Sequence, residues 1–203
     1  MPSYRCGLEA WIANPRISES WGRCGLLCNQ ASVTRDFEPA WDVAYRLLGP
    51  RLKALFGPQH GFYGTAQDNM IETGHARDPR LGIPIYSLYS ETRQPTPEMM
   101  DGIDTLIVDL QITGCRIYTW KATIAACLRA AARDGKRVVI LDRPNPVGGE
   151  ILEGRVLDMD STSFVGEFPI PMRHGLTAGE AALFFNRVIK AELDVVALEG
   201  WDP

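Results

Sequence analysis

Polar side chains that could bind or transform a small molecule follow the apolar runs of this sequence. They are Asn29, then Gln59 and His60, then Glu91 and Arg93, then Asp109 and Gln111, and finally Asp142, Arg143 and Asn145. If the runs are parallel strands, these side chains meet at one edge of the sheet, where such sheets bind their ligands. The opposite loops, such as Asp134-Gly135-Lys136, carry ordinary solvated charges. This asymmetry predicts a binding site at the edge formed by the carboxyl ends of the strands.

Gln59 and His60 occupy a loop framed by glycine and proline. Gly57-Pro58 ends an apolar run, because proline has no backbone N–H to donate to a sheet. Gly61 then permits backbone angles or close approaches that a side chain would block. We therefore expect the amide and the imidazole to be held in place, and a plain surface turn is the alternative interpretation.

Three carboxylates are candidates for acid and base chemistry. Asp109 follows a buried run, where a carboxylate must be hydrogen-bonded, paired or functional. Glu72 and Glu153 lie in the irregular segments 65–80 and 143–171, which could fold back over the same edge. Glycoside cleavage uses two carboxyl groups, one to protonate the leaving oxygen and one to attack or to activate water. The alternative for either glutamate is an exposed loop charge, and the sequence does not give the separation of the three groups.

The candidate binding residues offer amides, cations, a phenol and an imidazole, which suits a hydroxyl-rich or acidic ligand. Arg173 and His174 precede a helix capped at Thr177, and a helix N-terminus favours anions. Asp142, next to Arg143, is expected to cap or tether a loop. The expected substrate-binding residues are Gln59, Gln111, Arg116, Tyr118, Arg143, Asn145, Arg173 and His174.

Strands and helices alternate along the chain. Apolar runs predict strands over 25–30, 53–56, 83–89, 104–110, 138–142 and 194–198, and helical patterns cover 38–48, the segment after Thr96-Pro97, 120–133 and 177–192. Several strands are apolar throughout, as expected when both faces of a sheet are covered. The pattern therefore predicts an α/β, Rossmann-like fold with a mainly parallel sheet and helices on both faces.

Composition narrows the function further. With 203 residues, 45% of them hydrophobic, the chain can bury one substantial core. Its net charge of −4 does not favour binding to nucleic acid or to an anionic membrane. The five scattered cysteines fit packing roles in a reducing compartment. If Met1 is the true start, the absence of a signal-peptide pattern predicts a cytoplasmic protein.

Known cofactor motifs are missing from the sequence. Neither a Gly-x-Gly-x-x-Gly fingerprint nor a Walker-type loop is present, which disfavours dinucleotides and triphosphates. The three histidines are too dispersed to predict a metal site. Because Ser87 and Ser90 lack a nucleophile-elbow context, a serine hydrolase is a weak alternative. We expect no cofactor and no metal.

The sequence resembles the DUF1343 family through motifs that follow the family's order from Gly25 onward. They are FGPQHGF at 56–62, YSLY at 86–89, PTPEM at 95–99, DLQ at 109–111, GCRIYT at 114–119, LDRPNP at 141–146, EG at 153–154, SFVG at 163–166 and PMRHG at 171–175. Characterised members are glycoside hydrolases, exo-β-N-acetylmuramidases of the NamZ type. The resemblance implies removal of N-acetylmuramic acid from the non-reducing end of peptidoglycan fragments. It also implies a Rossmann-like domain joined to a smaller C-terminal domain.

Two departures from the family pattern bear on the chemistry. Many members have Glu in the position of Gln59 and Asp in the position of Thr113, although a subgroup is similar to this chain in carrying Gln at the first position. A neutral amide cannot act as acid, base or nucleophile. We therefore expect acid and base from Glu72, Asp109 or Glu153, with His60 beside them at the reacting centre.

The chain ends at Pro203, where the resemblance implies a further domain. We expect residues 1–203 to form the N-terminal catalytic domain, with the smaller C-terminal domain absent from this chain. The expected partner is a peptidoglycan-derived muropeptide or disaccharide, and Arg143, Arg173 and His174 are the candidates to bind its lactyl carboxylate. A non-catalytic domain that binds or senses muropeptides is the alternative function, motivated by Gln59 and by the length of the chain.

Overall fold

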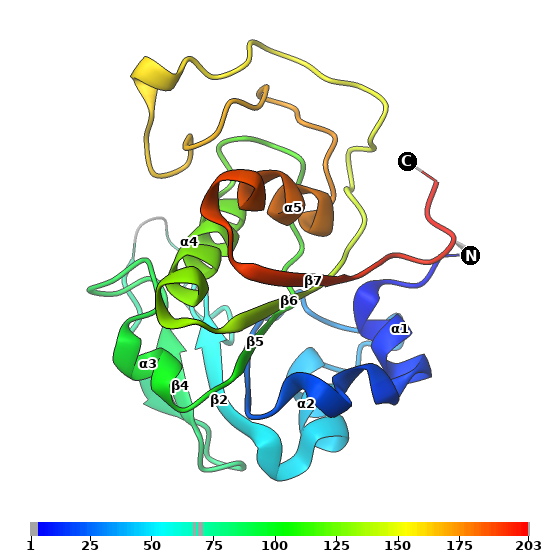
Figure 1. Ribbon diagram of the computed structural model, residues 1–203, viewed down its shortest axis with the longest axis vertical. Coiled ribbons are helices and arrows are strands. Elements are labelled where there is room, and N and C mark those ends of the chain that lie inside the picture. Colours follow the sequence, from blue (N-terminus) through cyan, green and yellow to red (C-terminus); the bar gives the residue numbers. More distant parts are fainter. Residues whose placement is uncertain (1–3, 67, 69–70, 203) are drawn as a thin grey trace.

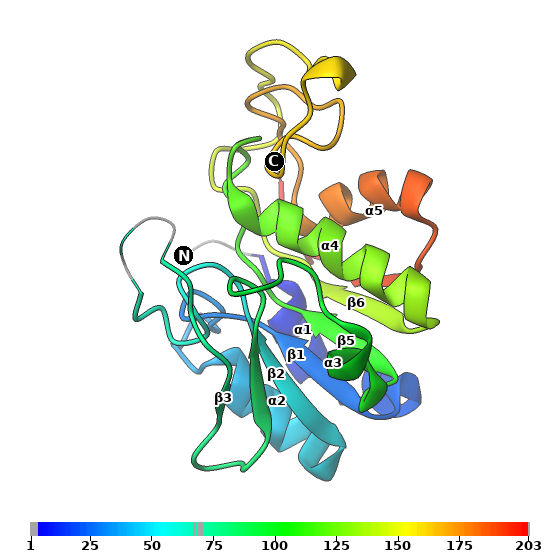
Figure 2. The same cartoon turned by 90° about the vertical axis from the view of Figure 1, so that its left-hand side faces the viewer.

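A computed structural model of the chain describes residues 4–66, 68 and 71–202 and shows a seven-stranded sheet covered by helices (Figures 1 and 2). The strands are β1 (Cys24–Leu27), β2 (Leu52–Gly57), β3 (Ala76–Arg77), β4 (Pro84–Ser87), β5 (Thr105–Val108), β6 (Arg137–Leu141) and β7 (Glu192–Val196). Their order is β3-β4-β2-β1-β5-β6-β7, and every neighbouring pair is parallel except β3 with β4. Without β3, the chain winds outward from β1 in both directions, as in Rossmann-like folds. The predicted fold class is confirmed.

Helices cover both faces of the sheet. They are α1 (Gly7–Ala13), α2 (Ala40–Leu48), α3 (Pro97–Asp101), α4 (Thr119–Asp134) and α5 (Ala178–Ile189), with short 3-10 turns at Pro15–Trp21, Gly49–Arg51 and Met159–Ser161. One hydrophobic cluster contains residues of α1 and α2, and the other contains residues of α3, α4 and α5. Figure 1 shows α1 and α2 on one side of the sheet and α4 and α5 on the other.

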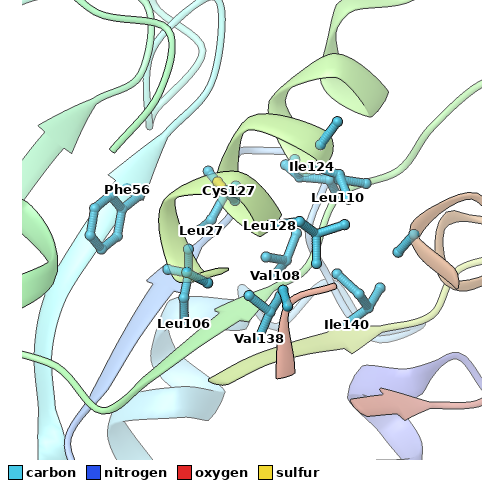
Figure 3. Close-up of a cluster of buried hydrophobic side chains, with 14 of the residues drawn as sticks. Leu27, Phe56, Leu106, Val108, Leu110, Ile124, Cys127, Leu128, Val138 and Ile140 are labelled. Carbon is cyan, nitrogen blue, oxygen red and sulfur yellow. The ribbon is translucent and has the colours of Figure 1, made fainter. Parts of the chain in front are cut away.

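Successive side chains of a central strand point to opposite faces. Leu106 and Val108 of β5 pack under α4, in the cluster drawn in Figure 3, whereas Ile107 packs on the α1/α2 side. All three are fully buried. This explains why the strand is apolar throughout, and it fixes the direction of every polar residue that follows a strand.

The capping signals of the sequence appear in the structure. Thr177 Oγ1 accepts a hydrogen bond from the Glu180 N–H at 3.2 Å, and Glu180 Oε2 accepts one from the Thr177 N–H at 2.9 Å. Gly135 ends α4 in the left-handed conformation, with φ of 63°. These local signals place the helices because they satisfy backbone groups that the helix itself leaves unpaired.

Two elements were not expected from the sequence. Helix α1 precedes the first predicted strand, and β3 lies in the segment 65–80, which was expected to be irregular. Residues 73–77 lie along β4 and the residues after it, where Tyr89 O accepts from the Thr73 N–H at 3.0 Å and His75 Nδ1 accepts from the Ser87 N–H at 3.0 Å. Gln67 and Asn69 of the same segment lie outside the described residues.

The remaining structural predictions concern cysteines and membranes. All five cysteines are free thiols, and four of them are buried, as expected for packing residues. No helix among the described residues is long and apolar enough to cross a bilayer.

Candidate active site

The chain reverses its winding direction between β1 and β5, and open α/β sheets bind ligands beyond the carboxyl ends of the strands at such a point. Ile107 and Leu141 pack on the α1/α2 face. Asp109 and Arg143 lie two residues further on and turn to the same face. The Asp142 side chain, one residue before Arg143, points to the opposite face of the sheet and turns toward α5. Alternation along two neighbouring strands therefore brings Asp109 and Arg143 together.

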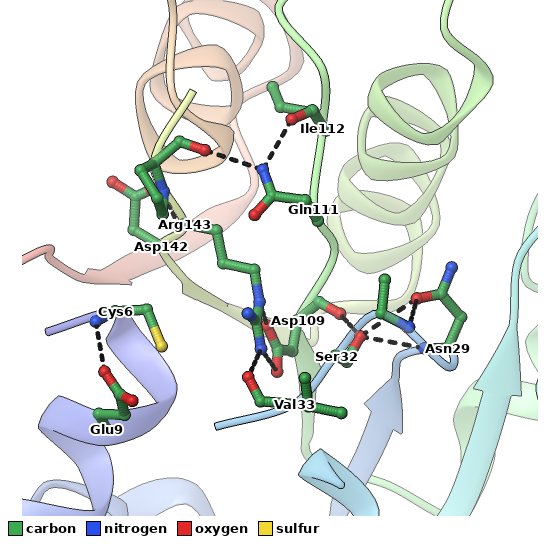
Figure 4. A network of polar contacts seen from close by, with 12 residues as sticks. Cys6, Glu9, Asn29, Ser32, Val33, Asp109, Gln111, Ile112, Asp142 and Arg143 are labelled. Carbon is green, nitrogen blue, oxygen red and sulfur yellow. Dashed lines mark hydrogen bonds and ion pairs between the residues drawn. The ribbon is translucent and has the colours of Figure 1, made fainter. Parts of the chain in front are cut away.

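Asp109 and Arg143 form a buried ion pair (Figure 4). Arg143 Nη2 donates to Asp109 Oδ2 at 2.9 Å, and Arg143 Nε donates to Asp109 Oδ1. Arg143 Nη2 also donates to Val33 O at 3.0 Å. The Asp109 side chain has no exposed surface and that of Arg143 is 8% exposed. Although burial acts to lower it, the Asp109 carboxylate raises the pKa of Arg143, so the guanidinium remains charged.

A cavity of about 230 Å³ lies against this ion pair. It is lined by Tyr4, Cys6, Glu9, Val33, Thr34, Arg35, Gln111, Arg143 and Pro144. Gln111 Nε2 donates to Ile112 O and to Pro144 O, both at 2.8 Å, which leaves its carbonyl oxygen as an acceptor. The cavity therefore contains two of the expected binding residues, Gln111 and Arg143, at the point where the sheet topology predicts a ligand.

Glu9 and Arg35 line this cavity but were not singled out in the sequence. Glu9 Oε1 accepts from Arg35 N at 2.9 Å and from Arg35 Nε at 3.2 Å, and Glu9 Oε2 accepts from Cys6 N at 3.1 Å. Burial acts to raise the pKa of Glu9, but these hydrogen bonds hold it below its usual value. The sequence signal was a glutamate three residues after the helix N-cap Cys6, and cysteine is an unusual residue at that position.

Asp142 tethers α5, as expected. Its carboxylate accepts from Gly179 N at 2.7 Å, from Thr177 Oγ1 at 2.9 Å and from Arg143 N at 2.9 Å. Burial raises the pKa of this carboxyl group. The expectation of an anion site at the start of this helix therefore needs correction, because Asp142 and the capping box already use the donors there.

His174 is buried next to α5 as a neutral imidazole. Its Nδ1 accepts from the Leu176 N–H at 3.2 Å, so Nε2 carries the proton, and Nε2 has no hydrogen-bond partner within the described part of the chain. Burial, with a contribution from the charge of Lys121, lowers the pKa of His174 to about 4. His174, as a neutral ring, therefore brings no positive charge to the carboxylate that it was expected to bind.

Glu153 and Arg173 form a partly exposed ion pair in the long segment between β6 and α5. Arg173 Nη1 donates to Glu153 Oε2 at 2.8 Å, and the two backbones exchange hydrogen bonds. The Glu153 side chain is 63% exposed. With Thr113 and Cys115, the pair lines a shallow open hollow. Glu153 is therefore accessible from solvent.

Three further expected binding residues hold the backbone or pack. Arg116 Nη1 donates to Arg155 O and Ile170 O, both at 2.8 Å, which anchors the segment between β6 and α5. Asn145 is buried, and its Nδ2 donates to Leu176 O at 3.2 Å. Tyr118 is half-buried and packs edge-on against Trp120, and burial raises its pKa.

The loop that carries Gln59 and His60 lies at the end of β2. His60 has φ of 75°, an unusual value for a residue with a side chain, and its Nδ1 donates to Ala66 O at 2.8 Å. Since a carbonyl can only accept, Nδ1 of this ring carries a proton. Gln59 is buried.

Glu72 lies near the loop that carries Gln59 and His60, because the adjacent Thr73 packs against Gly61. A Cβ atom on Gly61 would lie 3.1 Å from Thr73 Cγ2, which shows that the Thr73 side chain packs closely against this loop. Glu72 itself is 60% exposed at its side chain and pairs with Arg93 at 3.4 Å. Each of the three expected catalytic carboxylates is thus paired with an arginine, and Asp109 is the buried one.

Comparisons with known proteins agree with this architecture. Residues 24–203 match the family described as exo-beta-N-acetylmuramidase NamZ, N-terminal. The chain belongs to this family. It is 40% identical over 202 residues to the peptidoglycan beta-N-acetylmuramidase NamZ of Bacillus subtilis, an alignment that covers 98% of this chain and 49% of that protein.

Two solved structures of DUF1343 family proteins from Bacteroides fragilis share the fold. One has a TM-score of 0.90 at 36% identity and the other a TM-score of 0.80 at 30% identity. The first alignment covers 100% of this chain and 52% of the solved structure's chain, and the second covers 98% of this chain and 53% of the other. The chain therefore spans about half the length of these relatives, and the resemblance read from the sequence motifs is confirmed.

Proposed function

We propose that this chain binds the terminal N-acetylmuramic acid of peptidoglycan fragments and carries carboxylates of a glycoside hydrolase that removes this sugar. Membership of the NamZ family supports the proposal. The single structural observation that carries it is the cavity at the switch point of the sheet, which is lined by Arg143 of the buried Asp109–Arg143 pair.

The cavity suits one sugar unit. At about 230 Å³ it is smaller than the roughly 300–1,000 Å³ of pockets for drug-sized ligands. The carbonyl oxygen of Gln111 and the guanidinium of Arg143 offer an acceptor and donors to hydroxyl or acetamido groups. A small cavity of this kind fits an enzyme that removes end units one at a time.

We assign the acid and base roles to Glu72 and Glu153. Asp109 has no exposed surface and accepts from Arg143 with both oxygens, so we assign it the role of positioning that guanidinium. Glu72 and Glu153 are both more than half exposed at their side chains. His60, whose Nδ1 donates to Ala66 O, is the candidate for holding a substrate hydroxyl group through Nε2 beside Glu72.

The direct test is release of N-acetylmuramic acid from a chromogenic β-N-acetylmuraminide by the full-length protein. We expect Glu72→Gln and Glu153→Gln each to lower kcat by about 100-fold or more, the usual contribution of a general acid or base. Glu192→Gln is the matched control, since Glu192 of β7 is a surface carboxylate of similar exposure, 60%, that pairs with Arg137. Wild-type rates in both active-site variants would refute the assignment, and absence of turnover in the wild type would refute the enzymatic function.

A second candidate function is a domain that binds muropeptides without cleaving them. The observation that favours it is that no expected catalytic carboxylate is among the described residues that line the cavity. Isothermal titration calorimetry with N-acetylmuramic acid-containing fragments separates the two functions. Tight binding without release of sugar, in the full-length protein, would favour the binding domain.

A further inference from the structure

We propose that Arg35 selects acidic over neutral sugars in the cavity at the switch point, by exchanging its ion pair with Glu9 for one with a ligand carboxylate. The proposal rests on the proposed function, because it names the group that recognises the lactyl carboxylate of a muramyl ligand. It assigns to Arg35 a role that the sequence suggested for Arg143, Arg173 and His174.

Arg35 stands at the boundary between the cavity and the surface. It lines the cavity of about 230 Å³, and it also lines a neighbouring surface hollow of about 320 Å³. The two spaces share Glu9, Thr34 and Arg35. A ligand that enters the cavity from this hollow must therefore pass the Arg35–Glu9 pair.

The present contacts of Arg35 are ones that it can give up. Its Nε donates to Glu9 Oε1 at 3.2 Å, and its Nη2 donates to Tyr4 O at 2.6 Å. The Arg35 side chain is 53% exposed. An ion pair with such an exposed partner contributes little to stability, so turning the guanidinium toward a ligand has a small cost. Glu9 keeps its hydrogen bonds from the backbone N–H groups of Cys6 and Arg35 when the guanidinium leaves.

The other arginine of the cavity is less free. Arg143 is buried, and Asp109 and Val33 occupy its Nε and Nη2, as Figure 4 shows. Turning this side chain would leave the buried Asp109 carboxylate without its partner, which is costly. Arg143 therefore contributes charge from the floor, while Arg35 contributes a guanidinium that can move.

The chemistry of Arg35 favours a ligand carboxylate. Among the residues that line the cavity, Arg35 and Arg143 are positive and Glu9 is negative, and Asp109 behind the lining pairs with Arg143. A ligand carboxylate replaces Glu9 as the partner of Arg35 and accepts from its guanidinium in a two-pronged geometry, which arginine provides and lysine does not. N-acetylmuramic acid carries such a carboxylate on its lactyl group, and N-acetylglucosamine does not.

The test compares the affinities of N-acetylmuramic acid and N-acetylglucosamine by calorimetry with the full-length protein. We expect the wild type to prefer the acid, and Arg35→Ala to lose at least tenfold of that preference with little change for the neutral sugar. Arg23→Ala is the matched control, because Arg23 is a similarly exposed arginine that pairs with Asp104 and lines neither the cavity nor the neighbouring hollow. Retention of the preference in Arg35→Ala would overturn this inference and leave the proposed function intact. A wild type without preference would overturn both.

Glu9→Gln distinguishes recognition from a merely structural ion pair. Glutamine retains one oxygen for the Cys6 N–H, loses the acceptor of the Arg35 N–H, and removes the charge that competes for the Arg35 guanidinium. We expect this variant to bind the acid more tightly than the wild type by several-fold and the neutral sugar equally well. If the pair only fastens Tyr4 and α1 to the loop after β1, the affinity for the acid will stay the same or fall, and the inference is wrong.

Discussion

The buried ion pair between Asp109 and Arg143 makes a quantitative prediction about stability. Asp109→Asn keeps the size of the side chain but leaves a charged guanidinium in a site where it is 8% exposed. Removal of one partner of a buried pair typically costs about 3–5 kcal/mol, because the remaining charge is uncompensated. For a domain of this size that corresponds to a fall in Tm on the order of 10 °C. Denaturant unfolding followed by circular dichroism measures the loss in free energy of unfolding.

The double variant Asp109→Leu/Arg143→Met separates charge from packing. It removes both charges, so its only new polar defect is Val33 O, which loses its donor. We expect it to be more stable than Asp109→Asn by about 2 kcal/mol, since replacing a buried pair with apolar residues is often nearly neutral. Glu38→Gln on the exposed pair with Arg46 should change stability by less than about 1 kcal/mol. A cost below about 1 kcal/mol for Asp109→Asn, or a double variant no more stable than the single one, would refute the reasoning.

Two other perturbations test the loop after β2 and the buried histidine. An alanine Cβ at Gly57 would lie 2.6 Å from the Phe62 backbone nitrogen. Gly57→Ala should therefore lower the free energy of unfolding by about 1–3 kcal/mol. Gly102 has no atom within 4 Å of such a Cβ position, so Gly102→Ala should change the free energy of unfolding by less than about 0.5 kcal/mol. Equal Tm values for the two variants would contradict the close approach. Because the pKa of His174 falls from 6.5 to about 4 on folding, its contribution to stability is complete above pH 6.5 and decreases as the pH falls toward 4, by up to about 3 kcal/mol. Unfolding measured at pH 7 and pH 4.5 should show that the free energy of unfolding decreases less in His174→Asn than in the wild type. Identical decreases would show that His174 is not buried as a neutral ring.

The sequence predicts the elements that carry their own signals. Leu106 to Val108 forms a continuous apolar run because both sides of β5 are covered, and such a run is recognisable without coordinates. The spacing of Thr177 and Glu180 likewise predicts the start of α5, because the two residues form a capping box within the helix's own first turn. By contrast, β3 has two exposed residues and exists through its pairing with β4, so nothing within the segment indicates a strand.

The partners of the polar residues depend on register and could not be predicted in the same way. The sequence allowed Asp109 to be either paired or functional, and its partner is 34 residues away. Val108 pairs with Ile140 across β5 and β6, and this register places Asp109, after β5, beside Arg143, after β6. For the same reason Asp142, in phase with the opposite face, caps α5. A shift of one residue in either strand would have exchanged these roles.

The position of the cavity follows from the winding of the chain. Helix α2 follows β1 on one face and α4 follows β5 on the other, so the connections leave the sheet in opposite directions and open a space between them. The far wall comes from Tyr4, Cys6 and Glu9, which precede residue 24, where the match to the family begins. Glu9 on this wall neutralises Arg35 on the loop after β1 when no ligand is bound. The affinity for an acidic sugar is then set by competition between the Glu9 carboxylate and the ligand carboxylate for one guanidinium, so substitutions at Glu9 should change the ligand preference without touching the sheet.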